Sequence, residues 1–243
     1  MTTLFVSDLH LEPSRPAVTA LFVDFLQRRA GTADALYILG DLFEAWIGDD
    51  DDDPLGEQVA GALRRLSEAG TPVHFVHGNR DFLLGDDYAR RSGMHLLPET
   101  RVIDLHGTPT LILHGDTLCT DDADYQAFRA KVRDPEWQRR ILALPLEQRR
   151  AMASQLREDS RRATRLKPED ITDVNPQAVT AALRTHGVRH MIHGHTHRPA
   201  VHRLTVDGDE ARRYVLGDWY EQGSVLAAGP GEWRLQALPL AGT

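Results

Sequence analysis

The sequence contains a single cysteine, Cys119, among its 243 residues. One cysteine excludes an intrachain disulfide and any cysteine-rich zinc module, and it fits a reducing compartment such as the cytoplasm. No hydrophobic run approaches the roughly 18 residues of a membrane span. The first residues also lack a basic stretch followed by an apolar one, so we find no export signal there. The fold must therefore rest on a hydrophobic core, which a chain of this size can build without staples.

The composition is that of an ordinary globular protein, with 41% hydrophobic and 26% charged residues. This excludes a disordered or low-complexity chain. The net charge of −8 argues against a nucleic-acid partner. The charge is uneven, because residues 129–167 carry twelve Lys or Arg against five Asp or Glu. Negative charge is concentrated in a run of five acidic residues, Asp49 to Asp53, which we interpret as solvated surface. No obligate protein partner is evident.

Short apolar runs alternate with amphipathic stretches over the first 115 residues. They predict strands over 4–7, 35–39, 73–76 and 110–113, and helices over 16–29 and 55–68. Strands separated by helices indicate an α/β fold with a substantial parallel component. Near the end of the chain we expect a helix over 177–185, a strand over 190–193, and further strands over 201–206, 213–216, 224–227 and 233–238. Turn residues between these last four strands predict a second sheet built mainly of antiparallel hairpins.

No strand pattern occurs between residues 122 and 167. Apolar side chains instead recur at the spacing of one helix face from Tyr125 and again from Trp137, and a third, basic segment over 151–165 is also helical in pattern. We therefore predict an α/β core interrupted by a helical insertion. The core comprises residues 1–121 and 168–243, and the insertion comprises 122–167.

Each of five predicted strands is followed by a turn rich in metal-ligand residue types. These turns are Asp8-Leu9-His10, Gly40-Asp41, Gly78-Asn79-Arg80-Asp81, His114-Gly115-Asp116 and Gly194-His195-Thr196-His197. In open α/β sheets, functional groups gather beyond the carboxyl ends of the strands. The glycines suit tight turns whose side chains face one point. We therefore expect the five turns to converge.

The converging turns supply seven candidate metal ligands: Asp8, His10, Asp41, Asn79, His114, His195 and His197. This number supports two metal ions. Carboxylate, amide and imidazole ligands without a thiolate suit Mn²⁺, Fe²⁺ or Zn²⁺ in five- or six-coordinate sites. Asp41 is the best candidate for a bridging carboxylate. Two bridged ions can activate a water and neutralise charge during an in-line phosphoryl displacement.

The order Asp-x-His, Gly-Asp, Gly-Asn, His-Gly-Asp, Gly-His-x-His resembles the calcineurin-like metallophosphoesterase superfamily. The resemblance implies a four-layer α/β/β/α sandwich with a dinuclear site at the strand ends. One cation would be held by Asp8, His10, Asp41 and His197. The other would be held by Asp41, Asn79, His114 and His195.

Many members of that superfamily have a histidine where this chain has Arg80. Arg80 cannot be a general acid, because its pKa lies above about 12, but it can grip a phosphate and stabilise transition-state charge. A site without that acid favours a leaving group that needs no proton. A phosphate, with a second pKa near about 6, leaves as an anion, so we predict a phosphoanhydride substrate. The candidate catalytic residues are Asp41, Asn79, Arg80 and His195.

Longer segments around these motifs, such as residues 40–50 and 114–122, resemble the UDP-2,3-diacylglucosamine diphosphatases of lipid A biosynthesis. That resemblance implies two Mn²⁺ ions and attack of water on the α-phosphorus of UDP-2,3-diacylglucosamine. The products would be UMP and 2,3-diacylglucosamine 1-phosphate (lipid X). The substrate-binding positions of that family fall on Asn79, Arg80, Asp122, Ser160, Thr164, Lys167 and His195. Thr164 departs from the asparagine found in some members.

A lipid substrate gives the insertion a function that fits its composition. Its apolar residues could line a site for two acyl chains: Tyr125, Phe128, Val132, Trp137, Ile141, Leu144, Leu146 and Met152. Its basic residues could bind phosphate and face anionic headgroups: Arg157, Arg161, Arg162, Arg165 and Lys167. We therefore predict that the insertion is a lipid-binding cap and that the protein associates peripherally with the cytoplasmic face of the inner membrane.

Three other functions compete with this prediction. A nucleotide-sugar or dinucleoside polyphosphate pyrophosphohydrolase would share the metal site but would have no use for an apolar, basic insertion. A non-catalytic scaffold on the same fold would be expected to lose metal ligands, whereas all seven are present here. A DNA exonuclease conflicts with the net charge of −8.

Overall fold

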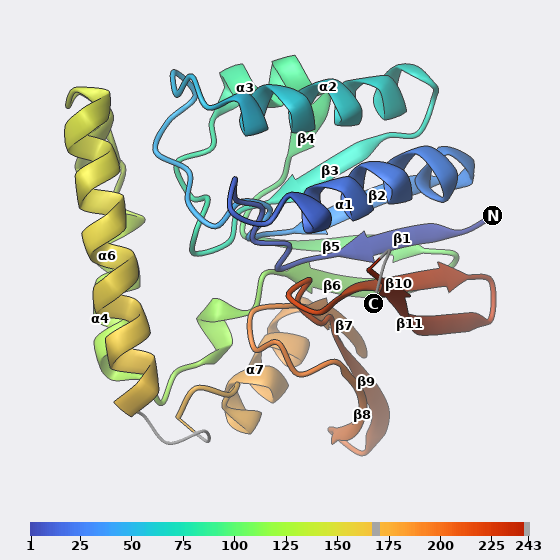
Figure 1. Ribbon diagram of the computed structural model, residues 1–243. Helices are drawn as coiled ribbons and strands as arrows, with labels where there is room; N and C mark the ends of the chain where they lie inside the picture. The colour runs from blue at the N-terminus through green and yellow to red at the C-terminus, as the bar shows by residue number, and fades with distance from the viewer. Residues whose placement is uncertain (167–170, 241–243) are drawn as a thin grey trace.

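A computed structural model describes residues 1–166 and 171–240. Two β-sheets pack face to face, and helices cover both outer faces (Figure 1). The strand order is β11-β10-β1-β2-β3-β4 in the six-stranded sheet and β5-β6-β7-β9-β8 in the five-stranded sheet. The predicted four-layer α/β/β/α sandwich is confirmed.

The helices and strands follow one another in a largely alternating order. The first half of the chain forms β1 (Thr3–Val6), α1 (Pro16–Arg28), β2 (Ala35–Leu39), α2 (Pro54–Glu68), β3 (Val73–Val76), α3 (Asp86–Ser92), β4 (Met94–Leu96), β5 (Thr100–Leu105) and β6 (Thr108–Leu113). The second half forms α4 (Ala123–Val132), α5 (Pro135–Leu142), α6 (Leu146–Leu166), α7 (Pro176–His186), β7 (His190–His193), β8 (Ala200–Val206), β9 (Asp209–Val215), β10 (Gln222–Gly229) and β11 (Glu232–Pro239).

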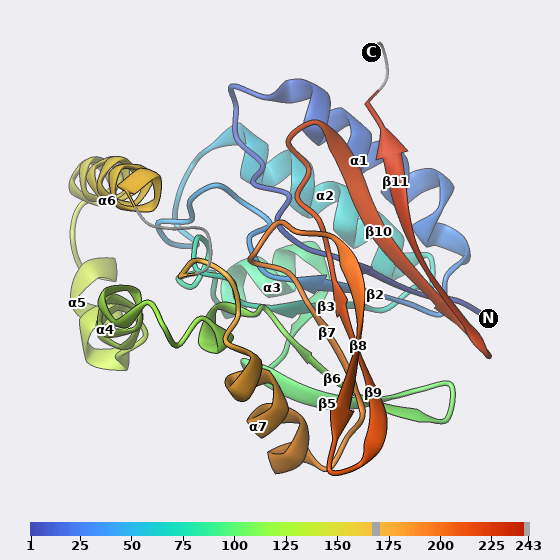
Figure 2. The same ribbon diagram turned by 90° about the horizontal axis from the view of Figure 1, so that it is seen from below.

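Parallel strands form the centre of the six-stranded sheet. The central strands β1, β2 and β3 are short and almost wholly buried, and they pair in parallel register. Helices α1, α2 and α3 cover their outer face (Figures 1 and 2). Helix α2 starts one residue before the predicted start at 55, because Asp53 accepts a hydrogen bond from the Leu55 backbone and Pro54 occupies the first turn. The parallel strands all end at the same edge of the sheet.

The two sheets share a hydrophobic core. Phe5 and Leu39 from the first sheet meet Ile112 and Ile192 from the second, and all four are buried. Helix α7 covers the outer face of the second sheet through a separate buried cluster that includes Leu183. This second layer carries β6 and β7 in parallel, so their carboxyl ends meet those of β1 to β3.

The predicted sheet of C-terminal hairpins is wrong for two of its four strands. Strands β8 and β9 join the five-stranded sheet, but β10 and β11 extend the six-stranded sheet beside β1. Most of β10 is buried, since it lies between β1 and β11 and faces α1 on one side and the second sheet on the other. The pattern of apolar residues in its sequence indicates a strand but does not reveal which strand it pairs with. The elements α3, β4 and β5 were not predicted.

Helices α4, α5 and α6 stand beside the sandwich, on the side toward which β1 and β3 point (Figures 1 and 2). The acidic run joins the core to this group. Asp49 accepts hydrogen bonds from the Gly85 and Tyr88 backbones, and Asp50 forms an ion pair with Arg149 of α6. The interpretation of the run as solvated surface is therefore right for the exposed Asp50 and Asp52 but wrong for Asp49. Among the described helices, none is both long and apolar enough to cross a membrane.

Candidate metal centre

The five ligand-bearing turns meet at one place because hydrogen bonds tie them together. The Asp8 backbone N donates to the Gly40 carbonyl at 3.1 Å, and the His10 N donates to the Asp41 carbonyl at 2.9 Å. The Gly194 N donates to the His114 carbonyl at 2.8 Å, which links the turns after β6 and β7. Both sheets therefore contribute to a single centre at their carboxyl ends, as the sequence predicted.

Two glycines permit a close approach between these turns. A Cβ atom at position 78 would overlap the carboxylate of Asp41, and one at position 194 would overlap the carboxylate of Asp8. Any other residue at Gly78 or Gly194 would push a carboxylate out of the centre. The glycines in these two motifs are thus explained by space rather than by turn conformation alone.

Five of the candidate ligands have left-handed backbone conformations. The φ angles are +53° for Asp8, +48° for His10, +53° for Asp41, +69° for His195 and +56° for His197. Non-glycine residues rarely adopt this region, at a cost of about 1–3 kcal/mol each. Such strain clusters at functional sites, and here the sharp turn after each strand aims the side chain into the centre.

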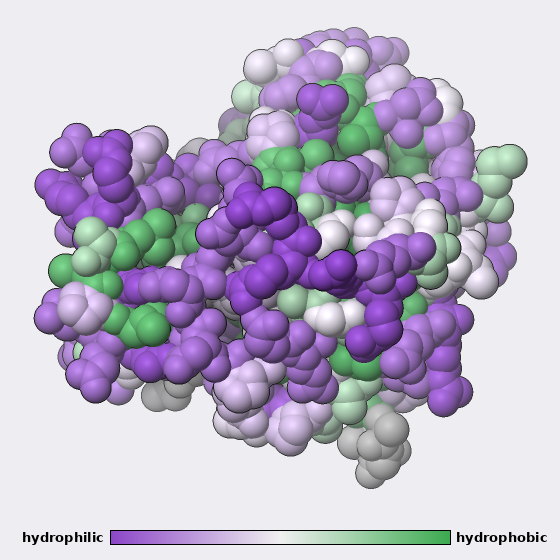
Figure 3. All heavy atoms as spheres, turned by 90° about the horizontal axis from the view of Figure 1, so that it is seen from above, coloured by the Kyte–Doolittle hydropathy of each residue, from purple (hydrophilic) through white to green (hydrophobic). Residues whose placement is uncertain are grey.

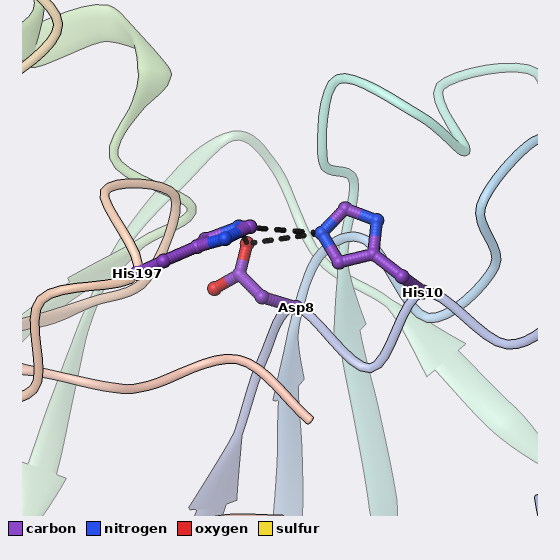
Figure 4. Close-up of side chains that lie close together, drawn as sticks. All are labelled: Asp8, His10 and His197. Carbon is purple, nitrogen blue, oxygen red and sulfur yellow. Dashed lines mark hydrogen bonds and ion pairs between the residues drawn. The ribbon is translucent and has the colours of Figure 1, made fainter. Parts of the chain in front are cut away.

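The first cluster consists of Asp8, His10 and His197 (Figure 4). The Nε2 atoms of His10 and His197 lie 3.3 Å apart. Asp8 Oδ1 lies 3.4 Å from His197 Nε2 and 4.0 Å from His10 Nε2. Asp8 Oδ2 accepts hydrogen bonds from Ser7 Oγ and the His195 N. Asp8 Oδ1 is buried and has no hydrogen-bond partner among the described residues. A cation fits this arrangement, because a buried carboxylate oxygen without a hydrogen bond and two imidazole nitrogens lie close enough together to share it.

The second cluster lies on the other side of Asp41. Asp41 Oδ2 is 3.8 Å from His10 Nε2 and 3.7 Å from His114 Nε2, so it stands between the two clusters as a bridging ligand would. Asn79 Oδ1 is 2.9 Å from both His114 Nε2 and His195 Nδ1. Asp8, Asp41 and His114 also lie close enough to share one ion. All seven predicted ligands thus come together.

The electrostatics of the centre favour bound positive charge. Burial alone would raise the pKa of Asp8, but the neighbouring histidines, led by His197, hold it well below its usual range. Burial would lower the pKa of His197, yet its contacts with Asp218 and Asp8 raise that pKa to about 10. Burial and the nearby His114 lower the pKa of His195 to about 4, so that ring is neutral at pH 7. Asp8 and His195 are therefore in the forms that bind metal, an ionised carboxylate and a neutral imidazole, whereas His197 would release a proton when an ion binds.

A cavity of about 410 Å³ opens between the metal-centre turns and helices α4, α5 and α6. Polar side chains from both parts face it, including Asn79, Arg80, Asp122 and Ser160. Apolar side chains of α4, α5 and α6 line the rest: Tyr125, Phe128, Trp137, Ile141, Met152 and Leu156. Pockets of this size commonly hold small molecules.

Residues 1–199 match the model of the calcineurin-like phosphoesterase family. The chain belongs to this family. The phosphoesterase is 56% identical over 245 residues to a UDP-2,3-diacylglucosamine hydrolase of Stenotrophomonas maltophilia (strain K279a), covering 98% of this chain and 99% of that protein. It is 55% identical over 239 residues to a UDP-2,3-diacylglucosamine hydrolase of Klebsiella pneumoniae, covering 98% and 100%.

Two solved structures share the fold of the phosphoesterase at low sequence identity. One is a novel archaeal phosphodiesterase, with a TM-score of 0.51, 10% identity, and coverage of 98% of this chain and 100% of that chain. The other is a hypothetical protein from Pyrococcus horikoshii OT3, with a TM-score of 0.51, 11% identity, and coverage of 99% and 89%. At such identities these likenesses show the fold alone.

The predicted substrate-binding residues divide into three groups. Asn79, Arg80, Asp122 and Ser160 line the cavity of the phosphoesterase, and His195 lies in the metal centre beside it. Lys167 lies outside the described residues, as do the side chains of Thr164, Arg161 and Arg165.

Among the predicted acyl-chain residues, Val132 is buried, and Leu144 and Leu146 are not part of the cavity lining. Arg157 lines the cavity and Arg162 is exposed.

Sequence reasoning missed the contribution of the core to the cavity. Five residues in the loops that follow Asp41 and Asn79 also line it: Ala45, Trp46, Ile47, Phe82 and Leu83. The sequence could have pointed to these residues, because large apolar side chains there follow directly after ligand-bearing turns. It also missed Glu44 and Asp218, two acids that contact the outer nitrogens of His10 and His197. Their spacing from the predicted ligands follows no pattern that would have pointed to them.

Proposed function

We propose that this phosphoesterase hydrolyses the diphosphate bond of UDP-2,3-diacylglucosamine, giving UMP and 2,3-diacylglucosamine 1-phosphate in lipid A biosynthesis. One observation carries the proposal: a single cavity has phosphate-binding residues beside the metal centre and apolar walls from the helical insertion. A diphosphate that joins a nucleotide to a diacylated sugar needs both surfaces. Full-length relatives at 55–56% identity, named hydrolases of this substrate, support the same reaction.

The metal centre would hold two Mn²⁺ ions. Asp8, His10 and His197 would bind the first, Asn79, His114 and His195 the second, and Asp41 both. When bound, the ions would activate water for attack on the α-phosphorus and neutralise phosphate charge. The chain itself keeps the shared ligand in place, since Asp41 Oδ1 accepts a hydrogen bond of 2.8 Å from the Arg80 backbone N.

Arg80 would bind the diphosphate and stabilise its developing charge. Its side chain lines the cavity, and its Nε atom is buried with no hydrogen-bond partner among the described residues. A buried, unpaired guanidinium donor is costly, and a phosphate oxygen would satisfy it. Arg80 supplies no proton at neutral pH, so the leaving sugar phosphate departs as an anion.

Helices α4, α5 and α6 would form a cap over the acyl chains. Their apolar side chains turn toward the cavity, and Arg157 adds positive charge on its wall. Hydrophobic atoms also reach the surface of this part of the molecule, surrounded by hydrophilic ones (Figure 3). Phe128 of α4 is 37% exposed and Leu142 of α5 is 41% exposed. With the basic α6, this surface suits peripheral association with the cytoplasmic face of the inner membrane.

The decisive experiment measures UMP release from UDP-2,3-diacylglucosamine, with Mn²⁺ and after chelation, beside UDP-N-acetylglucosamine. We expect fast, metal-dependent release from the lipid substrate alone, because only that substrate fills the apolar part of the cavity. Equal rates on both substrates would contradict the proposal. That result would instead favour a general nucleotide-sugar or dinucleoside polyphosphate pyrophosphohydrolase, with the insertion serving only to pack against the core.

A further inference from the structure

Both imidazoles of the first cluster have a carboxylate at their outer nitrogen. His10 Nδ1 lies 2.9 Å from Glu44 Oε2, and His197 Nδ1 lies 3.3 Å from Asp218 Oδ2. The Glu44 side chain is only 5% exposed, so this contact is shielded from water. In each ring the opposite nitrogen, Nε2, faces the cluster. Each carboxylate thus lies behind a ring whose Nε2 is turned inward, which is where an outer carboxylate stands behind a metal-binding imidazole.

The second cluster lacks this arrangement among the described contacts. The outer nitrogen of His114, Nδ1, lies 2.8 Å from the carbonyl oxygen of Leu39, which is a neutral acceptor. His195 turns its Nδ1 inward, toward Asn79 Oδ1 at 2.9 Å. A carbonyl fixes the ring as a carboxylate does but adds no negative charge. The two clusters therefore differ in the groups directly behind their imidazoles although their inner ligands are similar. The buried Asp116 also lies near His114 and His195, but Arg129 pairs with it at 2.7 Å.

The loop after β9 covers the first cluster as a unit. Trp219 is fully buried, and its backbone N donates to the Asp8 carbonyl at 3.1 Å. Asp218 Oδ1 accepts a hydrogen bond of 3.0 Å from the Tyr220 N, and the Tyr220 ring stacks on His10 with centroids 5.3 Å apart. Trp219 anchors the loop, so Asp218 and Tyr220 are held against the two imidazoles. The contact of Asp218 with His197 is part of an ordered structure.

We propose that Glu44 and Asp218 are positioning residues that make the Asp8–His10–His197 cluster the tighter of the two cation sites. A carboxylate behind a metal-binding imidazole fixes its tautomer and raises its basicity. Two such carboxylates also place negative charge near the ion, which a carbonyl cannot do. The inference rests on the two-cation centre proposed above, but it does not depend on which substrate is hydrolysed.

The test is a Mn²⁺ titration of the full chain without substrate, in which free Mn²⁺ is followed by electron paramagnetic resonance. We expect wild-type protein to bind two ions with unequal affinity. Glu44→Gln and Asp218→Asn should each weaken the tighter ion by about 10–100-fold and leave the weaker one unchanged. Glu57→Gln and Asp87→Asn are matched controls, because they remove the same charge from exposed surface ion pairs. Both controls should keep wild-type affinities.

Two further backgrounds assign the effect to one cluster. In a His114→Ala background, the ion that remains should occupy the first cluster, so adding Glu44→Gln should weaken it. In a His197→Ala background, the remaining ion should be insensitive to the same substitution. This double-mutant design separates a local effect of the carboxylate from a change in the potential of the whole centre.

Three outcomes would overturn the inference: unchanged Mn²⁺ affinity in both carboxylate variants, equal weakening of both ions, or two wild-type ions of equal affinity. Thermal unfolding of the metal-free variants checks their folding. If Glu44→Gln does not fold, Asp218→Asn provides the same test at a more exposed position. Wild-type protein that binds fewer than two ions would contradict the two-cation centre itself. A failure of the proposed substrate would appear only in the UMP assay.

Discussion

At the scale of single residues, the backbone and the side chain of Arg80 have two separate roles. Its backbone N holds Asp41 Oδ1, whereas its side chain lines the cavity with an unpaired Nε. A change of side chain leaves the backbone contact in place. Arg80 is therefore the residue at which substrate binding can be altered without dismantling the metal centre.

We expect Arg80→Ala to lower kcat by about 10²–10³-fold, because it removes a donor aimed at the developing phosphate charge. Mn²⁺ content should remain at the wild-type level, since the Arg80 backbone still holds Asp41. Steady-state kinetics and metal analysis of the same preparation test both statements. Arg90→Ala, which alters an exposed arginine of α3, serves as the control. A variant that has lost its Mn²⁺ but turns over normally per bound metal would show that the role given to Arg80 is wrong.

At the scale of elements, the position of α6 depends on a contact with the acidic run. Arg149 is 3% exposed, and its guanidinium donates to the carbonyls of Leu144 and Ile47 at 2.9 and 2.6 Å and to the Asp50 carboxylate. The neighbouring Arg150 pairs with Asp51 and Asp52 on the exposed surface. The buried arginine, rather than the exposed one, fastens α6 to the core, because exposed ion pairs contribute little.

Replacing Arg149 by Met should loosen α6 and enlarge the cavity that it helps to enclose. We expect a loss of about 1–3 kcal/mol of stability, because the Leu144 and Ile47 carbonyls lose their donor, whereas the Asp50 side chain is 62% exposed and returns to water. KM for the lipid substrate should rise about tenfold or more, whereas kcat should change little, because the metal centre lies outside the contact. Urea unfolding and steady-state kinetics measure these changes. Arg150→Met should change the unfolding free energy by less than about 0.5 kcal/mol, and equal effects of the two variants would refute this account of α6.

At the scale of the whole molecule, the sequence predicted features whose signal is local. The five ligand turns were found because metal-ligand residue types follow apolar runs, and α2 because its sequence is amphipathic over 55–68. The pairing of β10 with β1 escaped prediction, since a strand sequence does not encode its distant neighbour. The contact of Asp50 with Arg149 escaped for the same reason, because 99 residues separate them. Long-range contacts of this kind determine the composition of the second sheet, the position of α6 and the carboxylates behind His10 and His197.

The stability of the whole fold should depend on pH through His193. Burial and the adjacent Arg213 lower the pKa of His193 to about 3. Its Nδ1 donates to the Gly194 carbonyl at 2.8 Å and its Nε2 accepts from Arg213 at 3.1 Å, so the native ring is neutral. The unfolded chain, with the usual pKa of 6.5, takes up a proton first as the pH falls. The free energy of unfolding should therefore decrease as pH falls from 6.5 toward 3.

Urea unfolding of metal-free protein between pH 7 and pH 4 tests this dependence. In wild type, His193 should account for a loss on the order of a few kcal/mol across that range. His193→Gln keeps an acceptor for Arg213 but does not titrate, so its unfolding free energy should fall less steeply with acid. His186→Gln, at an exposed position of α7, should leave the wild-type slope unchanged. Identical slopes for wild type and His193→Gln would exclude His193 as the source.

Attachment to a membrane surface, if the proposed lipid substrate is right, should involve the cap face of the molecule. Leu142 is 41% exposed on α5 without lining the cavity, so it can enter a lipid surface without affecting the site. We expect low-salt sedimentation with anionic vesicles to carry down the protein, and high salt or neutral vesicles to release it. Leu142→Ser should weaken binding several-fold, because it removes apolar area from the contact. Val201→Ser, at an equally exposed position on β8, should have no effect. Protein that stays in the supernatant at low salt would rule out attachment through this face.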